Sequence, residues 1–246
     1  MNSLFLIALP RSGSNLAYNA ACRMLGLRQP SWTGDGEILN LDRFAGHPIP
    51  RGGFAAHFTT REQNPDLFAR LTDFLDTAVR RDGFAYKDVV HPFVVSAWTE
   101  LRHLRVLHVR RDPAEVACAM LRRRWYYPAD AAVSAAHHTG SDSRRQCERE
   151  RDVLTISAAV VHGLVQAEQA LERVPAVRVD FNDVLPGRSG LSAALQELYP
   201  ELELRPLPPS TKAEITVALA RREQIRRSEA YRALRELVEK TRESLV

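Results

Sequence analysis

The chain has 246 residues, of which 45% are hydrophobic, so it is long enough to bury one core and is predicted to form one domain over residues 1–246. Its net charge of +4 suits an anionic small ligand at least as well as a nucleic acid, and charge alone excludes neither. The three cysteines are odd in number and widely spaced, without a CxxC pair, which argues against a disulfide framework and a zinc site. We therefore expect a reducing, cytoplasmic location.

The N-terminal third is predicted to begin with a strand, a tight loop and a helix. Residues 4–8 form a short apolar run, and the apolar residues that follow at positions 16–25 recur at helical spacing up to Gly26. The only apolar run near the N-terminus is thus about one strand long and has no basic stretch before it, so neither a targeting segment nor membrane insertion is expected. Residues 29–51 are predicted to be loop and residues 53–58 a short strand.

Farther along the chain, predicted strands and helices alternate. Asn64 and Pro65 form an N-cap with proline at the first helical position, and Asp112 and Pro113 do the same for a helix that runs to about residue 125. Strands are predicted at residues 84–87, 106–109 and 176–181, and further helices at 92–101, 154–171 and 191–198. Residues 126–149 are polar, which indicates a flap or loop. This order predicts an α/β fold with a central parallel sheet flanked by helices on both faces.

The last part of the chain, about residues 210–246, is predicted to be a charged helical extension. Thr211 and Glu214 have the spacing of a capping box, in which the hydroxyl and the carboxylate satisfy N–H groups at a helix start.

The loop between the first strand and the first helix has the strongest chemical pattern. Residues 10–15 read Pro-Arg-Ser-Gly-Ser-Asn, and a loop at such a junction directs backbone N–H groups and the positive end of the helix dipole at a bound anion. In an ATP-hydrolysing P-loop, lysine and then Ser or Thr follow the glycine, but here Gly13 is followed by Ser14 and Asn15. The phosphate clamp and the magnesium ligand are both missing, which disfavours a kinase or NTPase. The alternative is an ordinary strand-to-helix turn capped by Ser12 or Ser14.

This loop resembles the 5′-phosphosulfate loop of sulfotransferases that use 3′-phosphoadenosine 5′-phosphosulfate (PAPS), usually written P-[KR]-S-G-[TS]-[TS]. The resemblance implies a three-layer α/β/α fold of the P-loop type, and Arg11 would hold oxygens on the sulfuryl side of the donor. Asn15 departs from the usual Ser or Thr but keeps a hydrogen-bonding group. The donor-binding residues that it implies in this loop are Pro10, Arg11, Ser12, Gly13, Ser14 and Asn15.

A second segment, LRVLHVRRDPAEVACAM, resembles the element of the same family that binds the 3′-phosphate. The resemblance implies that Arg111 contacts this phosphate and that Asp112 and Pro113 fix the turn. An arginine at a helix start opposes the helix dipole, a conflict that an anion would remove. The family normally has a serine eight residues after this arginine, where this chain has Ala119. The arginines at 122–124, or those between 221 and 227, could compensate for the missing serine.

A third segment, Phe84-Ala85-Tyr86-Lys87-Asp88, resembles the strand that delivers a catalytic lysine in tyrosylprotein and related bacterial sulfotransferases. The ammonium of Lys87 would then lie at the oxygen that bridges sulfur and phosphorus. That oxygen gains charge as the bond breaks, so a cation there stabilises the transition state more than the ground state. The alternative is a lysine at a strand end whose ammonium reaches solvent.

Two residues are candidates for the general base that takes the proton of the acceptor hydroxyl. Glu37 lies in a Gly-Glu segment that resembles the base-bearing element of several branches of the family, and it is the favoured candidate. His91 follows Lys87 by four residues and matches the histidine of a Lys-Thr-Pro-x-His pattern in other members. As alternatives, Glu37 would be a solvated loop residue and His91 a helix-start histidine bonded to backbone.

Together these resemblances imply an enzyme that transfers a sulfuryl group from PAPS to a hydroxyl or amine and releases adenosine 3′,5′-bisphosphate (PAP). The Arg-Lys-Gly-x-x-Gly segment of cytosolic animal enzymes is absent from the sequence, so a bacterial branch with a small-molecule or carbohydrate acceptor is favoured. Neither a metal ion nor a nucleic-acid partner is expected. The alternatives are a divergent P-loop phosphotransferase or kinase, and a non-catalytic nucleotide-binding protein.

Overall fold

The computed structural model of this chain describes residues 3–30, 36–38, 60–79, 83–126, 148–149, 151–184 and 190–245. Its centre is a sheet of parallel strands in the order β2-β1-β3-β4. The strands are β1 (Leu4–Ala8), β2 (Ala85–Asp88), β3 (Arg105–Arg110) and β4 (Val177–Asp180). The predicted α/β fold with a central parallel sheet is confirmed.

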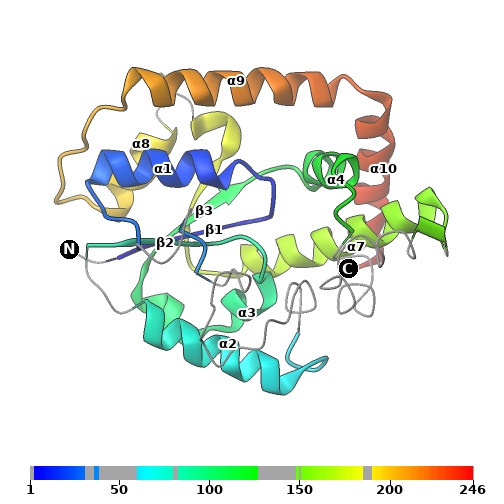
Figure 1. The fold of residues 1–246 in the computed structure, drawn as a ribbon, viewed down its shortest axis with the longest axis horizontal. Coiled ribbons are helices and arrows are strands. Elements are labelled where there is room, and N and C mark those ends of the chain that lie inside the picture. Colours follow the sequence, from blue (N-terminus) through cyan, green and yellow to red (C-terminus); the bar gives the residue numbers. More distant parts are fainter. Residues whose placement is uncertain are drawn as a thin grey trace.

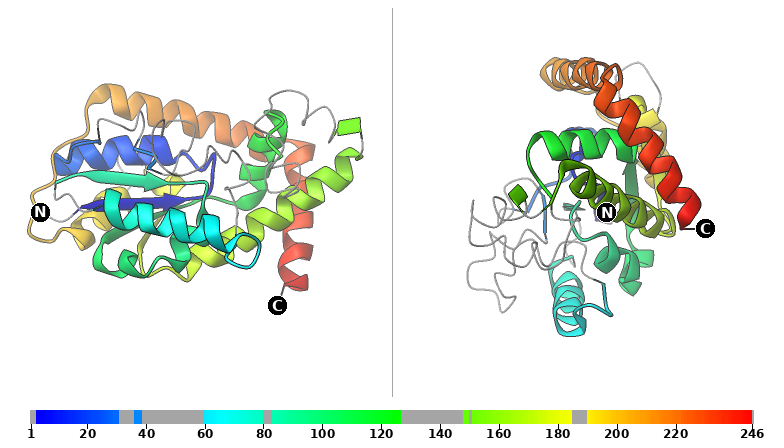
Figure 2. Two further views of the ribbon diagram at one scale, coloured as in Figure 1. Left: turned by 60° about the horizontal axis from the view of Figure 1, so that its bottom comes forward. Right: turned by 90° about the vertical axis from the view of Figure 1, so that its right-hand side faces the viewer.

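Helices cover both faces of this sheet, which gives the three layers seen in Figure 1 and, from two further directions, in Figure 2. One layer contains α1 (Ser14–Leu25) and α8 (Gly190–Leu198), with α9 (Pro209–Arg226) packed on the outside of α1. The other contains α2 (Pro65–Ala78), α3 (Pro92–Ala97) and α7 (Val153–Glu172). The helices α4 (Pro113–Arg122) and α10 (Glu229–Ser244) lie beyond the end of the sheet at which β1 leads into its loop. Among the described residues there are also two short 3₁₀ helices, η3 (Thr99–His103) and η5 (Phe181–Val184).

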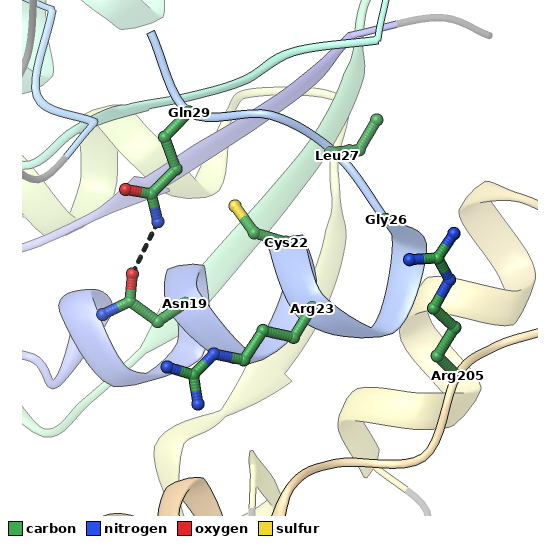
Figure 3. A pocket seen from close by; sticks show the side chains of 7 residues that line it. All are labelled: Asn19, Cys22, Arg23, Gly26, Leu27, Gln29 and Arg205. Carbon is green, nitrogen blue, oxygen red and sulfur yellow. Dashed lines mark hydrogen bonds between the residues drawn. The ribbon is translucent and has the colours of Figure 1, made fainter. Parts of the chain in front are cut away.

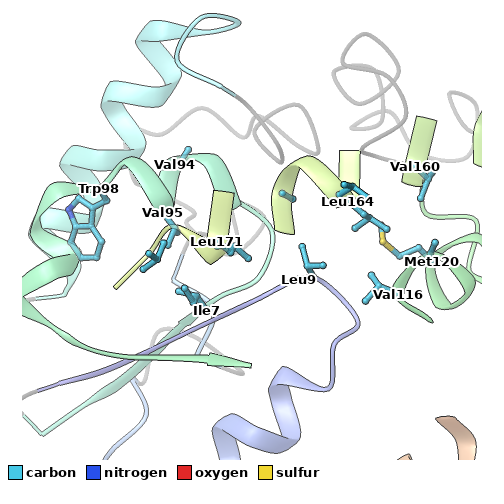
Figure 4. Packing of buried hydrophobic residues seen from close by; sticks show 14 of the residues in the cluster. Ile7, Leu9, Val94, Val95, Trp98, Val116, Met120, Val160, Leu164 and Leu171 are labelled. Carbon is cyan, nitrogen blue, oxygen red and sulfur yellow. The ribbon is translucent and has the colours of Figure 1, made fainter. Parts of the chain in front are cut away.

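The core on each face follows from the alternation of side chains along β1. Leu4, Leu6 and Ala8 pack into the cluster that includes α1 and α8, whereas Phe5 and Ile7 pack into the cluster that includes α2, α3 and α7. All of β1 is buried, as expected for a parallel strand that is covered on both faces. Figure 4 shows part of the second cluster, in which Ile7 of β1 and the nearby Leu9 lie among apolar side chains of α3, α4 and α7.

Two helix starts predicted from Asx-Pro pairs are confirmed. The Asn64 side chain accepts a hydrogen bond from the Leu67 N–H at 3.1 Å, and Asp112 accepts one from the Ala114 N–H at 2.8 Å. Each helix has proline at its first position, where a missing N–H leaves no hydrogen bond unmade.

The start of α9 differs from the prediction. The helix begins at Pro209 with Pro208 as its N-cap, and no side chain caps it. The predicted capping box of Thr211 and Glu214 is therefore wrong, because Thr211 already lies in the first turn and its hydroxyl accepts a hydrogen bond from Arg23. Proline at the first position sets φ for the helix in advance, so the start does not need a side-chain cap.

Three other elements end earlier than predicted, and the first is α3, which ends at Ala97 and is followed by η3. The helix α4 ends at Arg122, because Arg124 adopts a left-handed φ of 57° and the Trp125 N–H bonds back to the Met120 carbonyl, as in a Schellman motif. The strand β4 ends at Asp180, and the chain turns into η5. The strand predicted at residues 53–58 and most of the segment 126–149 lie outside the described residues. No described helix has both the length and the apolar character that crossing a membrane requires.

A buried histidine in the middle of the sheet makes the stability of the fold depend on pH. His108 lies on β3, with 3% of its side chain exposed. Burial lowers its pKa to about 4, and the positive charges of Arg178 and Arg110 act in the same direction. The carboxylate of Glu172 lies 3.8 Å from His108 Nδ1, but Arg178 also binds this half-exposed carboxylate.

We predict that acid destabilises the protein through His108. With a pKa of 6.5 unfolded and about 4 folded, the imidazole contributes stability above pH 6.5 that is lost as the pH falls toward 4. Since one pKa unit corresponds to about 1.4 kcal/mol, the loss should approach about 3 kcal/mol. Urea denaturation across this range should show a shallower pH dependence for His108→Gln. Identical slopes for both proteins would contradict the prediction.

Candidate phosphosulfate site at the end of the first strand

The loop between β1 and α1 has a backbone conformation that few residue types adopt easily. Arg11 has a φ of 59° and Gly13 a φ of 86°, both in the left-handed region. Gly13 is the N-cap of α1, and no side chain caps the helix, so the alternative of a turn capped by Ser12 or Ser14 is not what the structure contains. The helix start therefore directs N–H groups and its positive dipole end at the loop without a capping oxygen.

Phe181, which follows β4, packs against this loop. A Cβ atom added to Gly13 would lie 2.2 Å from Cε2 of Phe181, so the aromatic ring occupies the space that any larger side chain needs. Glycine is thus required at position 13 both by its φ and by this contact.

Lys87 extends from β2 toward α1 because of the strand register. It pairs with Leu6 of β1, and Leu6 belongs to the cluster on the α1 face of the sheet. The side chain is fully buried, and its ammonium donates a hydrogen bond to Asn15 Oδ1 on the first turn of α1. It also lies 5.5 Å from the ring centre of Tyr18, within the range of a cation–π interaction. Lys87 is thus a buried cation beside the loop, not a lysine that reaches solvent.

Glu37 is the second partner of the Lys87 ammonium. Its Oε1 lies 3.2 Å from Lys87 Nζ, and 16% of its side chain is exposed. Residues 36–38 run beside β2, because the Lys87 N–H donates to the Gly36 carbonyl at 2.8 Å and the Ile38 N–H donates to the Lys87 carbonyl at 3.1 Å. Backbone pairing therefore fixes Glu37 next to Lys87.

His91 lies apart from this pair. Side chains alternate along β2, so Asp88 projects to the face opposite Lys87, and its register partner Ile7 belongs to the other cluster. Asp88 accepts a hydrogen bond from the His91 N–H at 2.9 Å and lies 3.0 Å from His91 Nδ1. The His91 side chain is fully buried. The two candidate bases thus lie on different sides of β2, and Glu37 is the one beside Lys87.

Arg111 supports the loop through its backbone. Its Nη1 donates to the Arg11 carbonyl at 2.5 Å, and its Nε donates to Glu115 Oε2 at 2.8 Å. The Arg11 side chain is exposed, and its guanidinium lies 5.4 Å from the ring centre of Trp125. The residues predicted from the first and second motifs are therefore in direct contact.

Three further residues join this network, of which the sequence pointed only to the two arginines, as part of the run between 221 and 227. Glu115 is fully buried, and besides Arg111 it binds Arg222 and Arg226 from α9. Arg111 and Glu115 are four residues apart, as are Arg222 and Arg226. This spacing makes two side chains neighbours on one helix, so it predicts that the members of each pair lie close together. Nothing in either pattern indicates that the two pairs meet.

A pocket of about 570 Å³ lies elsewhere, at the opposite end of α1 (Figure 3). Its lining includes Asn19, Cys22, Arg23 and Arg205, but none of the predicted site residues. Burial raises the pKa of the Cys22 thiol to about 11, so the thiol is protonated at neutral pH and a poor nucleophile. No residue of the loop 10–15 lines this pocket.

We predict that Gly13→Ala lowers the free energy of unfolding by more than Gly83→Ala does. Gly83 has a similar φ of 78° but no atom within 4 Å of an added Cβ, so its substitution should cost only about 1–2 kcal/mol of backbone strain. Alanine at position 13 adds the clash with Phe181. Urea denaturation of both variants measures the difference, and equal losses would show that Phe181 does not confine the loop.

Searches against protein-family models, curated proteins and solved structures found no match to this chain.

Proposed function

We propose that this chain is a sulfotransferase that moves a sulfuryl group from PAPS to a hydroxyl or amine of a small-molecule or carbohydrate acceptor. One observation supports the proposal above all others. The fully buried Lys87 ammonium contacts both Asn15, on the first turn after the loop, and Glu37. The three motifs were matched independently along the sequence, yet residues from all of them lie around one loop.

The loop has the properties that an anionic donor requires. Its backbone leads into an uncapped helix N-terminus, which favours a phosphate or sulfate group. The Ser12 hydroxyl is buried and has no hydrogen-bond partner among the described residues, and such a donor is satisfied by a phosphate oxygen. Pro10, Arg11 and Ser14 belong to the same proposed donor site.

In the proposed reaction, the acceptor oxygen forms a bond to sulfur while the bond from sulfur to the bridging oxygen breaks. The electron pair of the broken bond stays on the phosphate of PAP, where a cation stabilises the developing charge. Lys87 supplies this cation. An ammonium has three N–H donors, and Asn15 and Glu37 take two of them in this structure.

The acceptor proton is assigned to Glu37. Its carboxylate is partly exposed and lies beside Lys87, so it can reach an acceptor that enters from solvent. His91 is fully buried on the other side of β2, with Nδ1 3.0 Å from Asp88.

The cytoplasmic location and the absence of a nucleic-acid partner stay predictions, as does the single-domain organisation.

Calorimetry tests the donor. We predict that PAP binds at least about tenfold more tightly than ADP with magnesium, because the loop lacks the lysine and the magnesium-binding hydroxyl of an ATP-binding P-loop. The opposite preference would favour a divergent phosphotransferase. Binding of PAP without sulfuryl transfer to any of a panel of alcohols, sugars and amines would favour the non-catalytic alternative.

We predict that Lys87→Ala lowers turnover by at least about 100-fold while PAP affinity changes little, because the ammonium acts on charge that appears in the transition state. Lys212→Ala, which removes an exposed lysine from α9, is the matched control and should leave turnover unchanged. Single-turnover rates and PAP titrations provide the two readouts. Equal losses of turnover and PAP affinity would refute this role of Lys87.

A further inference from the structure

The cluster around Glu115 contains more positive charge than its own carboxylate neutralises. Glu115 is fully buried, and its two oxygens accept hydrogen bonds from Arg111, Arg222 and Arg226. Burial would raise the pKa of Glu115, but the hydrogen bonds from these guanidinium groups outweigh burial and hold the pKa below its usual value. One negative charge thus faces three positive charges.

Two of the three guanidinium groups are buried. Side-chain exposure is 4% for Arg222 and 9% for Arg111, whereas Arg226 is 36% exposed and connects the cluster to solvent. Arg222 Nη1 is buried and has no hydrogen-bond partner within the described part of the chain. A buried guanidinium nitrogen without an acceptor costs free energy, and an anion would remove that cost.

The cluster also adjoins the donor loop. Arg111 contacts the Arg11 carbonyl and Glu115 through the same guanidinium group, so the loop and the cluster share one side chain. The helix α9, which supplies Arg222 and Arg226, packs against both α1 and α4, the helices that follow the loop and Arg111. Figure 1 shows α9 running above α1 toward α4.

Attachment of the C-terminal helices does not account for three arginines. The Tyr231 hydroxyl of α10 donates to Asp112 at 2.7 Å, Arg242 of α10 binds Glu168 of α7 at 2.8 Å, and Arg23 of α1 donates to Thr211 of α9. These contacts hold α9 and α10 at several points, whereas a single guanidinium would satisfy the Glu115 carboxylate.

The structure assigns to Arg222 and Arg226 of α9, together with Arg111, a binding site for a phosphate monoester, with Glu115 as the positioning residue that orients the three guanidinium groups. This inference rests on the proposed function, in which the ligand's other anionic group occupies the loop of residues 10–15. The C-terminal helical extension then forms part of the donor site and selects donors that have a second phosphate. The arginines of α9 thereby replace the phosphate-binding serine that the sulfotransferase family has at the position of Ala119.

The test compares PAP with AMP, which lacks the 3′-phosphate, by calorimetry on the full chain at constant ionic strength. Wild type should bind PAP at least about tenfold more tightly than AMP. Arg226→Gln, at a partly exposed site, should weaken PAP about tenfold or more and leave AMP within about twofold. Arg222→Gln should do the same. Arg221→Gln removes an exposed arginine one residue away on α9 with the same change of net charge, and should alter neither affinity.

The outcomes separate this inference from the proposed function. If wild type binds PAP no more tightly than AMP, or if Arg226→Gln and Arg222→Gln leave the ratio of the two affinities unchanged, the α9 site is refuted while the donor loop stands. If Arg221→Gln lowers PAP affinity as much as Arg226→Gln, the effect is one of general charge, and the α9 site is likewise refuted. If wild type binds neither nucleotide, the proposed function fails and the inference fails with it.

Discussion

A fully buried ammonium group on β2 imposes the main constraint on the centre of this protein. Removing a cation from water costs several kcal/mol unless polar partners replace the lost hydration. For Lys87 these partners come from separate parts of the chain, Asn15 on α1 and Glu37 beside β2, with the ring of Tyr18 nearby. The strand, the helix and the segment 36–38 must therefore come together for the lysine to be tolerated, and the loop of residues 10–15 is held between them.

The position of each chemical group follows from strand alternation. Lys87 and Asp88 are adjacent in sequence, yet their side chains project to opposite faces of the sheet. Lys87 contacts Glu37 on one face, and Asp88 contacts His91 on the other. The ammonium of Lys87 and the carboxylate of Asp88 are thus separated by the sheet. A shift of one residue in the pairing of β1 with β2 would exchange the two faces and bring Asp88 beneath α1, so the register of two short strands determines the chemistry of the site.

Much of this could be predicted from local sequence patterns. The apolar run of residues 4–8, the Gly13 loop and the Asn64-Pro65 and Asp112-Pro113 starts act over a few residues, and the structure contains the strand, loop and helices that they predict. The start of α9 could not be predicted from Thr211, because a distant partner, Arg23, engages the hydroxyl that was expected to cap the helix. The contact of Glu115 with the arginines of α9 could not be predicted for a related reason. These arginines lie more than 100 residues away from Glu115, and only the packing of α9 on α4 brings them together.

The contact between Gly13 and Phe181 has a consequence for how this sequence can vary. Because the ring fills the space above the glycine, a side chain at position 13 becomes possible only if position 181 first becomes smaller and another residue supplies the left-handed backbone. Phe181 directly follows the last strand of the sheet, so a change in the length of β4 would displace the ring and uncover the loop. Two segments that lie far apart in the sequence are thereby bound to change together, and divergence near residue 181 would alter the proposed donor loop without any substitution in the loop itself.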